Sequence, residues 1–260
     1  MASQPIYEFY AELTGFKPKI WRRFQVMNNI TVARLGYVLQ TLFEMKASHL
    51  MAVEIPHGEN TYRRMRRDYP EIPSDSRVFD DRDEIWRLDF IDDDTGELQP
   101  SYRSNVKMGY ITEERIKYIV KYIGDELSME YDFGDSWWVK VTLEKVFRDE
   151  NILGKDLPRV LEGENFGIIE DSGGISGLAE LVRAFKRKTG WKYKELSAWL
   201  GKDEFDITEF DIDDMNFRLK KIPRIYEEIY EYDLEPTKYS IGLIERKYLK
   251  KSNAKPNAST

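Results

Sequence analysis

The sequence predicts an α+β domain: an antiparallel or mixed β-sheet packed against helices, followed by a helical C-terminal part. Residues 6–13 and 137–147 alternate apolar and polar side chains with the period of two that marks half-buried strands. Residues 32–45 place apolar side chains at helical spacing. Hydrophobic residues make up 41% of the 260 positions, which is enough apolar material for a large core.

The first half of the chain is expected to supply most of the sheet. Turn residues Gly15 and Pro18 separate two strands that should pair antiparallel, and Thr31 is the expected N-cap of the helix that follows. Residues 57–110 are less regular and combine an arginine cluster with an acidic segment at 71–97. The predicted elements are strands at 6–13, 20–26, 49–55 and 85–90 and a helix at 32–45.

The second half is expected to contain a hairpin and then helices. Strands at 129–133 and 137–147 reverse at Gly134-Asp135, where glycine tolerates a positive φ. The predicted helices are 113–123 capped by Thr112, 178–188 ended by Gly190, 192–200 ended by Gly201, 211–221 capped by Asp211, and 226–232 after Pro223. The expected organisation is a core at 1–177, a helical part of the same domain at 178–245, and a basic flexible tail at 246–260.

Composition excludes several classes of protein. The chain has no cysteine, which rules out disulfides, thiolate catalysis and cysteine zinc sites. The formal net charge of −7 disfavours direct nucleic-acid binding unless basic groups cluster locally. We expect a cytoplasmic protein without membrane contact, because the N-terminus lacks a signal pattern and no apolar run is long enough to span a bilayer.

The most informative motif is Tyr131-Asp132-Phe133-Gly134-Asp135, followed at once by Ser136-Trp137-Trp138. A second acidic and glycine-rich cluster extends from Glu170 to Gly177. Hard divalent cations such as Mg²⁺ and Ca²⁺ prefer oxygen ligands, so the candidate metal ligands are Asp132, Asp135, Glu170 and Asp171. The alternative, which we favour, is that the two aspartates of the first motif accept backbone N–H bonds and stabilise the turn.

The neighbours of these carboxylates complete a candidate binding surface. Trp137 and Trp138 should point to opposite faces of a strand, one into the core and one partly exposed to a ligand, a partner or a loop. Gly173 and Gly174 precede a helix and would offer N–H groups to an anion, but the adjacent carboxylates favour a structural loop. For His49 a capping or hydrogen-bonding role is favoured over general-base catalysis.

Known catalytic motifs are missing from the sequence. His49 and His57, the latter expected in a loop, form neither a zinc triad nor an HExxH motif. The chain contains no GxSxG element and no P-loop. The Asp-Phe-Gly string lacks the other protein-kinase motifs.

Several blocks, taken in order, resemble the plasmid pRiA4b ORF-3-like proteins. They span Tyr7 to Leu219 and are Lys17–Arg23, Leu35–Phe43, Ser48-His49-Leu50, Tyr131–Trp137, Gly163, Glu170-Asp171, Gly173-Gly174, Phe210-Asp211, Asn216 and Leu219. The resemblance implies an α+β fold and an association with plasmids, phages or transposons, and it implies no reaction. The chain departs from the family pattern at Leu161 and at Ile168-Ile169, where a cysteine-containing segment and prolines are usual.

Three functions follow as hypotheses, and the first two belong to different classes. The leading one is an interaction protein of a mobile genetic element that uses the hairpin motif and the Glu170–Gly174 loop to bind a protein partner. In its extreme form, acidic segments at 71–97 and 203–214 would inhibit a nucleic-acid-binding protein by charge complementarity. The alternative is a phosphoester hydrolase that depends on a divalent cation bound by Asp132, Asp135, Glu170 and Asp171. A weaker third hypothesis is a nucleic-acid accessory that uses the arginine cluster and the basic tail.

Overall fold

A single mixed sheet organises the protein, which we describe from a computed structural model covering residues 4–91 and 95–248. Among these residues eight strands pair in the order β5-β4-β3-β6-β7-β1-β2-β8, antiparallel throughout except for the parallel β4–β5 pair. The strands are β1 (Ile6–Leu13), β2 (Trp21–Met27), β3 (Met51–Ile55), β4 (Ile85–Asp89), β5 (Val106–Tyr110), β6 (Glu126–Tyr131), β7 (Trp137–Phe147) and β8 (Arg159–Glu164).

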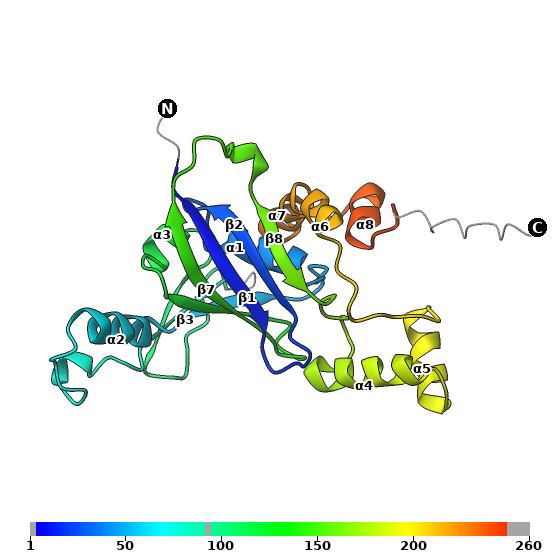
Figure 1. The fold of residues 1–260 in the computed structure, drawn as a ribbon, viewed down its shortest axis with the longest axis horizontal. Helices are drawn as coiled ribbons and strands as arrows, with labels where there is room; N and C mark the ends of the chain where they lie inside the picture. The colour runs from blue at the N-terminus through cyan, green and yellow to red at the C-terminus, as the bar shows by residue number, and fades with distance from the viewer. Residues whose placement is uncertain (1–3, 92–94, 249–260) are drawn as a thin grey trace, which may run out of the picture.

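Helices cover one face of the sheet and extend beyond its ends (Figure 1). They are α1 (Val32–Leu42), α2 (His57–Asp68), α3 (Ile116–Ile119), α4 (Gly174–Arg187), α5 (Trp191–Leu200), α6 (Ile212–Leu219), α7 (Ile222–Tyr232) and α8 (Lys238–Ile244). The predicted α+β class with a helical C-terminal part is therefore confirmed. None of the helices in the described ranges has the length and apolar character of a bilayer-spanning segment.

The core lies between the sheet and the layer formed by α1, α6 and α7 (Figure 1). Alternation along β1 shows how the sequence builds it: Phe9, Ala11 and Leu13 are fully buried, whereas Tyr10 and Glu12 lie on the other face. That second face carries charged and polar side chains and is left open by the helices in Figure 1. Because a strand alternates strictly, one buried face is enough to fix the register of β1 against its neighbours.

Several local predictions hold. The side chain of Thr31 accepts from the backbone N–H of Arg34 and caps α1, and the Asp211 carboxylate accepts from two backbone N–H groups at the start of α6. Gly201 ends α5 in the left-handed conformation. These signals are read correctly from the sequence because each depends on residues within one turn of the chain.

Other local predictions were wrong. His57 begins helix α2 rather than lying in a loop, and the helix expected from Thr112 is reduced to α3. Helix α3 is short because the N–H groups of Ile116 and Lys117 donate to backbone carbonyls of the segment before α1. Lys188 rather than Gly190 ends α4, and Pro223 lies in the first turn of α7 instead of preceding the helix. Strands β5 and β8 and helix α8 were not predicted.

Parts of two predicted segments lie outside the described residues: Asp92-Asp93-Asp94 of the acidic segment, and 249–260 of the basic tail. Within the described part, Arg246 forms ion pairs with Glu44 and Asp214, at 2.6 and 2.5 Å.

Candidate functional site

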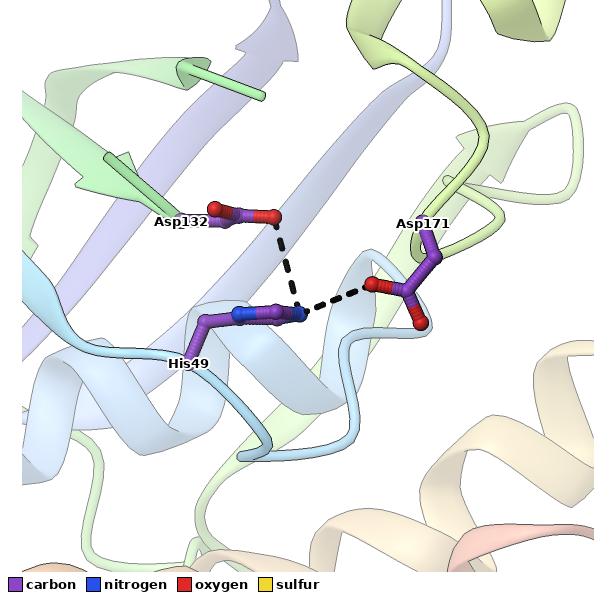
Figure 2. A group of neighbouring side chains, drawn as sticks. All are labelled: His49, Asp132 and Asp171. Atoms are coloured by element: carbon purple, nitrogen blue, oxygen red, sulfur yellow. Dashed lines mark ion pairs between the residues drawn. The ribbon is translucent and has the colours of Figure 1, made fainter. Parts of the chain in front are cut away.

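Three loops meet at one end of strands β3 and β6. They are the segment between α1 and β3, the turn between β6 and β7, and the loop that precedes α4 (Figure 2). His49 Nε2 lies 3.5 Å from Asp132 Oδ2 and 3.3 Å from Asp171 Oδ1, so one imidazole nitrogen faces two carboxylates from different loops. The structure thus brings together three of the predicted candidate residues.

The β6–β7 turn sets the position of Asp132. Asp132 takes a left-handed φ of 56°, and its Oδ1 accepts from the backbone N–H groups of Gly134 (3.0 Å) and Asp135 (3.3 Å). One carboxylate oxygen therefore stabilises the turn, as the structural interpretation predicts, while the other is turned toward His49. The predicted positive φ at Gly134 was wrong, because Asp132 and Ser136 take the left-handed conformation instead. At Gly134 a Cβ would approach Asp132 Oδ1 to 3.2 Å, so glycine there gives room to the carboxylate.

Glu170 holds the loop that carries His49. Its two oxygens accept from the backbone N–H of Lys46 and from Ser48 Oγ, both at 2.6 Å, and from the Tyr131 hydroxyl. Burial, reinforced by the Glu170 carboxylate, raises the pKa of Tyr131 well above its ordinary value. The phenol is therefore a proton donor at neutral pH, and Glu170 is a positioning residue rather than a ligand.

Helix α7 supports the same loop from the helical layer. Tyr230 donates its hydroxyl to the carbonyl of His49, and Tyr226, one turn earlier, donates to the carbonyl of Met45. The Tyr131 ring lies edge-on to the imidazole with 5.8 Å between centroids. The sequence analysis did not identify the two α7 tyrosines. Their spacing of four residues places them on one face of the helix, and this is the signal that could have identified them.

Asp135 joins the turn to the start of α4. Its Oδ2 accepts from the backbone N–H of Gly173 at 3.1 Å. Gly173 and Gly174 both have positive φ, and a Cβ on Gly174 would lie 2.6 Å from the carbonyl oxygen of Asp135. This close approach requires glycine, and it leaves Asp135 directed at backbone rather than at the imidazole.

The two indoles behind the turn do point to opposite faces. Trp137 is fully buried in the core, and Trp138 is half-buried with its Nε1 donating to Ser136 Oγ at 3.0 Å. Trp138 therefore lies on the open face of the sheet, away from the helical layer.

The assembled group has the donor set of a metal site. Ligand atoms of His49, Asp132 and Asp171 all lie within 4.8 Å of one another. In the described part of the chain, His49 Nε2 is a buried nitrogen without a hydrogen-bond partner. The Asp171 side chain is 70% exposed and that of His49 is 30% exposed, so the outer side of the group is open to solvent. An imidazole with two carboxylates suits a divalent first-row ion and leaves coordination positions for water or substrate.

Comparisons with known proteins identify the family and a similar fold, and they name no reaction. A family model described as plasmid pRiA4b ORF-3-like protein matches residues 5–214, a range that contains all three residues of the group. A crystal structure of a protein of unknown function from Methanosarcina mazei Go1 is similar, with 25% sequence identity and a TM-score of 0.60 over 82% of this chain and 98% of that one. A search of curated proteins finds no match.

Proposed function

The chain belongs to the plasmid pRiA4b ORF-3-like family, and we propose that it is a divalent-cation-binding protein that hydrolyses phosphoesters. His49, Asp132 and Asp171 would hold the ion. The observation that carries the proposal is His49 Nε2, which faces two carboxylate oxygens at 3.3 and 3.5 Å. Family membership supports a role on a mobile genetic element, and we include that role and a cytoplasmic location in the proposal.

The arrangement of these side chains fits a bound divalent cation. The nitrogen and two oxygens converge from three loops that hydrogen bonds hold in place. Asp132 is held by its own turn, His49 by Tyr230, and the loop that carries Asp171 by the bond from Gly173 to Asp135. Such outer contacts orient metal ligands before the ion binds. Nitrogen ligation favours Zn²⁺ over Ca²⁺ and Mg²⁺, which prefer all-oxygen sites, and the two carboxylates also suit Mn²⁺. An ion with open positions would polarise a phosphoryl oxygen and activate water for attack.

Calorimetric titration with Zn²⁺, Mn²⁺, Mg²⁺ and Ca²⁺ tests the cation site. We expect binding of Zn²⁺ or Mn²⁺ at one site per chain, with affinity reduced at least tenfold in His49→Ala, Asp132→Asn and Asp171→Asn. Glu209→Gln, which changes an exposed carboxylate elsewhere, is the control and should bind as wild type does. Hydrolysis of bis-p-nitrophenyl phosphate should require the same ion and be lost in the same variants.

The competing structural explanation is a protonated His49 that bridges the two carboxylates as an ion pair. Under that explanation no ion would bind at neutral pH, and His49→Ala would lower stability without altering any metal titration. A folded wild-type protein that takes up none of the four ions would therefore overturn the proposal. Ion binding without hydrolysis would retain the cation site and remove the enzymatic part.

A second candidate function, protein-partner binding, is favoured by the apolar rim of this group. Leu50 and Phe133 directly follow His49 and Asp132 and are 57% and 45% exposed. Large apolar side chains next to charged ones are typical anchors of protein interfaces. Photo-crosslinking from position 133 in cells that carry the element should capture a protein that the control position Val146, 40% exposed on the sheet, does not capture. Equal labelling from both positions would reject this surface.

The proposal does not extend to charge mimicry of a nucleic acid. Most carboxylates of the 203–214 segment bind groups of the same chain: Asp203, Glu204, Asp206, Asp211 and Asp214. A nucleic-acid mimic instead needs carboxylates that are free and arrayed on one face.

A further inference from the structure

The basic residues of α4 and α5 form a local cluster on an otherwise acidic chain. Residues 183–202 contain seven lysines and arginines and one glutamate, whereas the whole chain has a formal net charge of −7. In Figure 1, α4 leads away from the sheet and α5 lies at its far end. We call this helical pair, with the turn between them and Lys202, the α4–α5 arm.

Most of the positive charge on the arm is free of carboxylates. Lys188 pairs with Glu204 at 2.8 Å, and Lys192 pairs with Glu180 and Glu195 at 3.5 and 3.3 Å. Five other cations of the arm are exposed and form no ion pair with any residue that the structure describes: Arg183, Lys186, Arg187, Lys194 and Lys202. Unpaired cations gathered on one element create a local positive field even when the net charge is negative.

Two indoles stand on the outside of the same arm. Trp191 is 73% exposed and Trp199 is 48% exposed, although tryptophan is usually well buried. They lie two turns apart on α5, and Lys194 is exposed between them. The inner side of the arm is occupied by other aromatic residues, since Phe185 packs edge-on against Tyr193 with 5.5 Å between centroids. The outward indoles are therefore not needed for the packing of α4 against α5.

We propose that the α4–α5 arm binds single-stranded nucleic acid. Free cations would contact the phosphates, and the two indoles would stack on unpaired bases, the combination by which proteins bind single strands without sequence preference. A duplex hides its base faces and would use only the cations. An anionic membrane is less well matched, because a membrane-surface helix presents a continuous apolar face. Here the exposed face of α5 also carries Lys194 and Glu195.

The test measures the fluorescence anisotropy of a fluorescein-labelled 20-nucleotide oligothymidylate as protein is added. EDTA is present, so that no divalent cation occupies the cation site. We expect binding that weakens steeply between 50 and 200 mM NaCl. Lys186→Gln/Arg187→Gln/Lys194→Gln should weaken it at least tenfold and reduce the salt slope by about 2, at roughly 0.7 per lost phosphate contact. The matched control Lys17→Gln/Lys121→Gln/Lys155→Gln removes three exposed lysines elsewhere and should cost less than twofold.

Aromatic variants separate stacking from charge. Trp191→Ala/Trp199→Ala should weaken binding about tenfold, whereas Trp191→Phe/Trp199→Phe should stay within about threefold of wild type. His49→Ala should bind as wild type does, so that failure of the cation site and failure of the arm are distinguishable. Three outcomes would overturn the proposal: no binding at 50 mM NaCl, equal losses in the two triple variants, or arm-dependent binding only to phosphatidylserine vesicles.

Discussion

Arg22 is fully buried, yet it forms no ion pair with a carboxylate among the described residues. Instead its guanidinium donates to five backbone carbonyls, those of Trp21, Leu42, Glu164, Asn165 and Phe166, and lies 4.0 Å above the Phe210 ring. Burial lowers its pKa to about 9, which still leaves the group charged at neutral pH. The planar fork of N–H donors lets this one side chain hydrogen-bond a carbonyl at the end of α1 and carbonyls at and beyond the end of β8.

Replacement of Arg22 by Met should therefore destabilise the fold by about 3 kcal/mol or more, because buried carbonyls left without donors each cost about 1–3 kcal/mol. Arg22→Lys should also be destabilising, since one ammonium cannot reach all five acceptors. Urea unfolding of both variants is the measurement, with the exposed Arg148→Met as the control expected within about 0.5 kcal/mol of wild type. An unchanged midpoint in Arg22→Met would contradict this role.

The start of α4 meets the β6–β7 turn through two glycines that differ in one respect. Both have positive φ, at 87° for Gly173 and 67° for Gly174. An added Cβ finds no atom within 4 Å at the first position, whereas at the second it lies 2.6 Å from the carbonyl oxygen of Asp135. Alanine substitutions at the two positions therefore separate two costs: that of a left-handed backbone, which both share, and that of a steric clash, which only Gly174 has.

Gly173→Ala should cost about 1–2 kcal/mol from its left-handed backbone alone. Gly174→Ala should cost about 1–3 kcal/mol more, because the contact with Asp135 forces a backbone shift. The shift would also move the turn that carries Asp132, so cation affinity should fall in Gly174→Ala and hold in Gly173→Ala. Gly242→Ala within α8, where a Cβ meets no atom, is the control and should be neutral or stabilising. Equal losses at both glycines would show that sterics contribute nothing.

Carboxylates on the open sheet face connect neighbouring strands of the sheet. Glu8 on β1 is buried, accepts from Gln25 on β2 at 2.7 Å, and pairs with Lys145 on β7 at 2.5 Å. Burial raises the pKa of Glu8, but the bonds from Lys145 and Gln25 outweigh it and leave the pKa below its ordinary value. The pKa values of Glu12, Glu84 and Glu126 are lowered in the same way by bonds from cations.

A carboxyl group with a lowered pKa in the folded state adds stability that is complete above its unfolded pKa and is lost as pH falls through its folded pKa. The free energy of unfolding should therefore fall as pH drops below about 4.5. Glu8→Gln should be less stable than wild type by about 1 kcal/mol at pH 7, and the gap should close toward pH 3. Urea titrations at pH 7, 5, 4 and 3 measure this, and a constant gap would show that packing, not charge, carries the effect.

Features that depend on near neighbours along the chain could be predicted from the sequence. Alternation identified β1 and β7, side-chain caps at Thr31 and Asp211 set the starts of two helices, and the Asp132 turn followed from its own backbone amides. Helix α2 was missed because only Gly58 and Asn60 are buried in it, so no apolar period marks it. Strand β8 was missed because it is short and polar and contains a glycine.

The groups that the carboxylates face could not be predicted, because they come from loops that meet only in the folded protein. Four carboxylates look equivalent in the sequence: Asp132, Asp135, Glu170 and Asp171. In the structure, however, Glu170 accepts hydrogen bonds from Tyr131 and Ser48, and Asp135 accepts one from Gly173. Asp132 and Asp171 are left to share His49, which the sequence placed on the candidate surface without a partner. Local pattern fixes which groups a loop carries, but the direction of each side chain depends on the loops that packing brings beside it. No short-range signal encodes that arrangement.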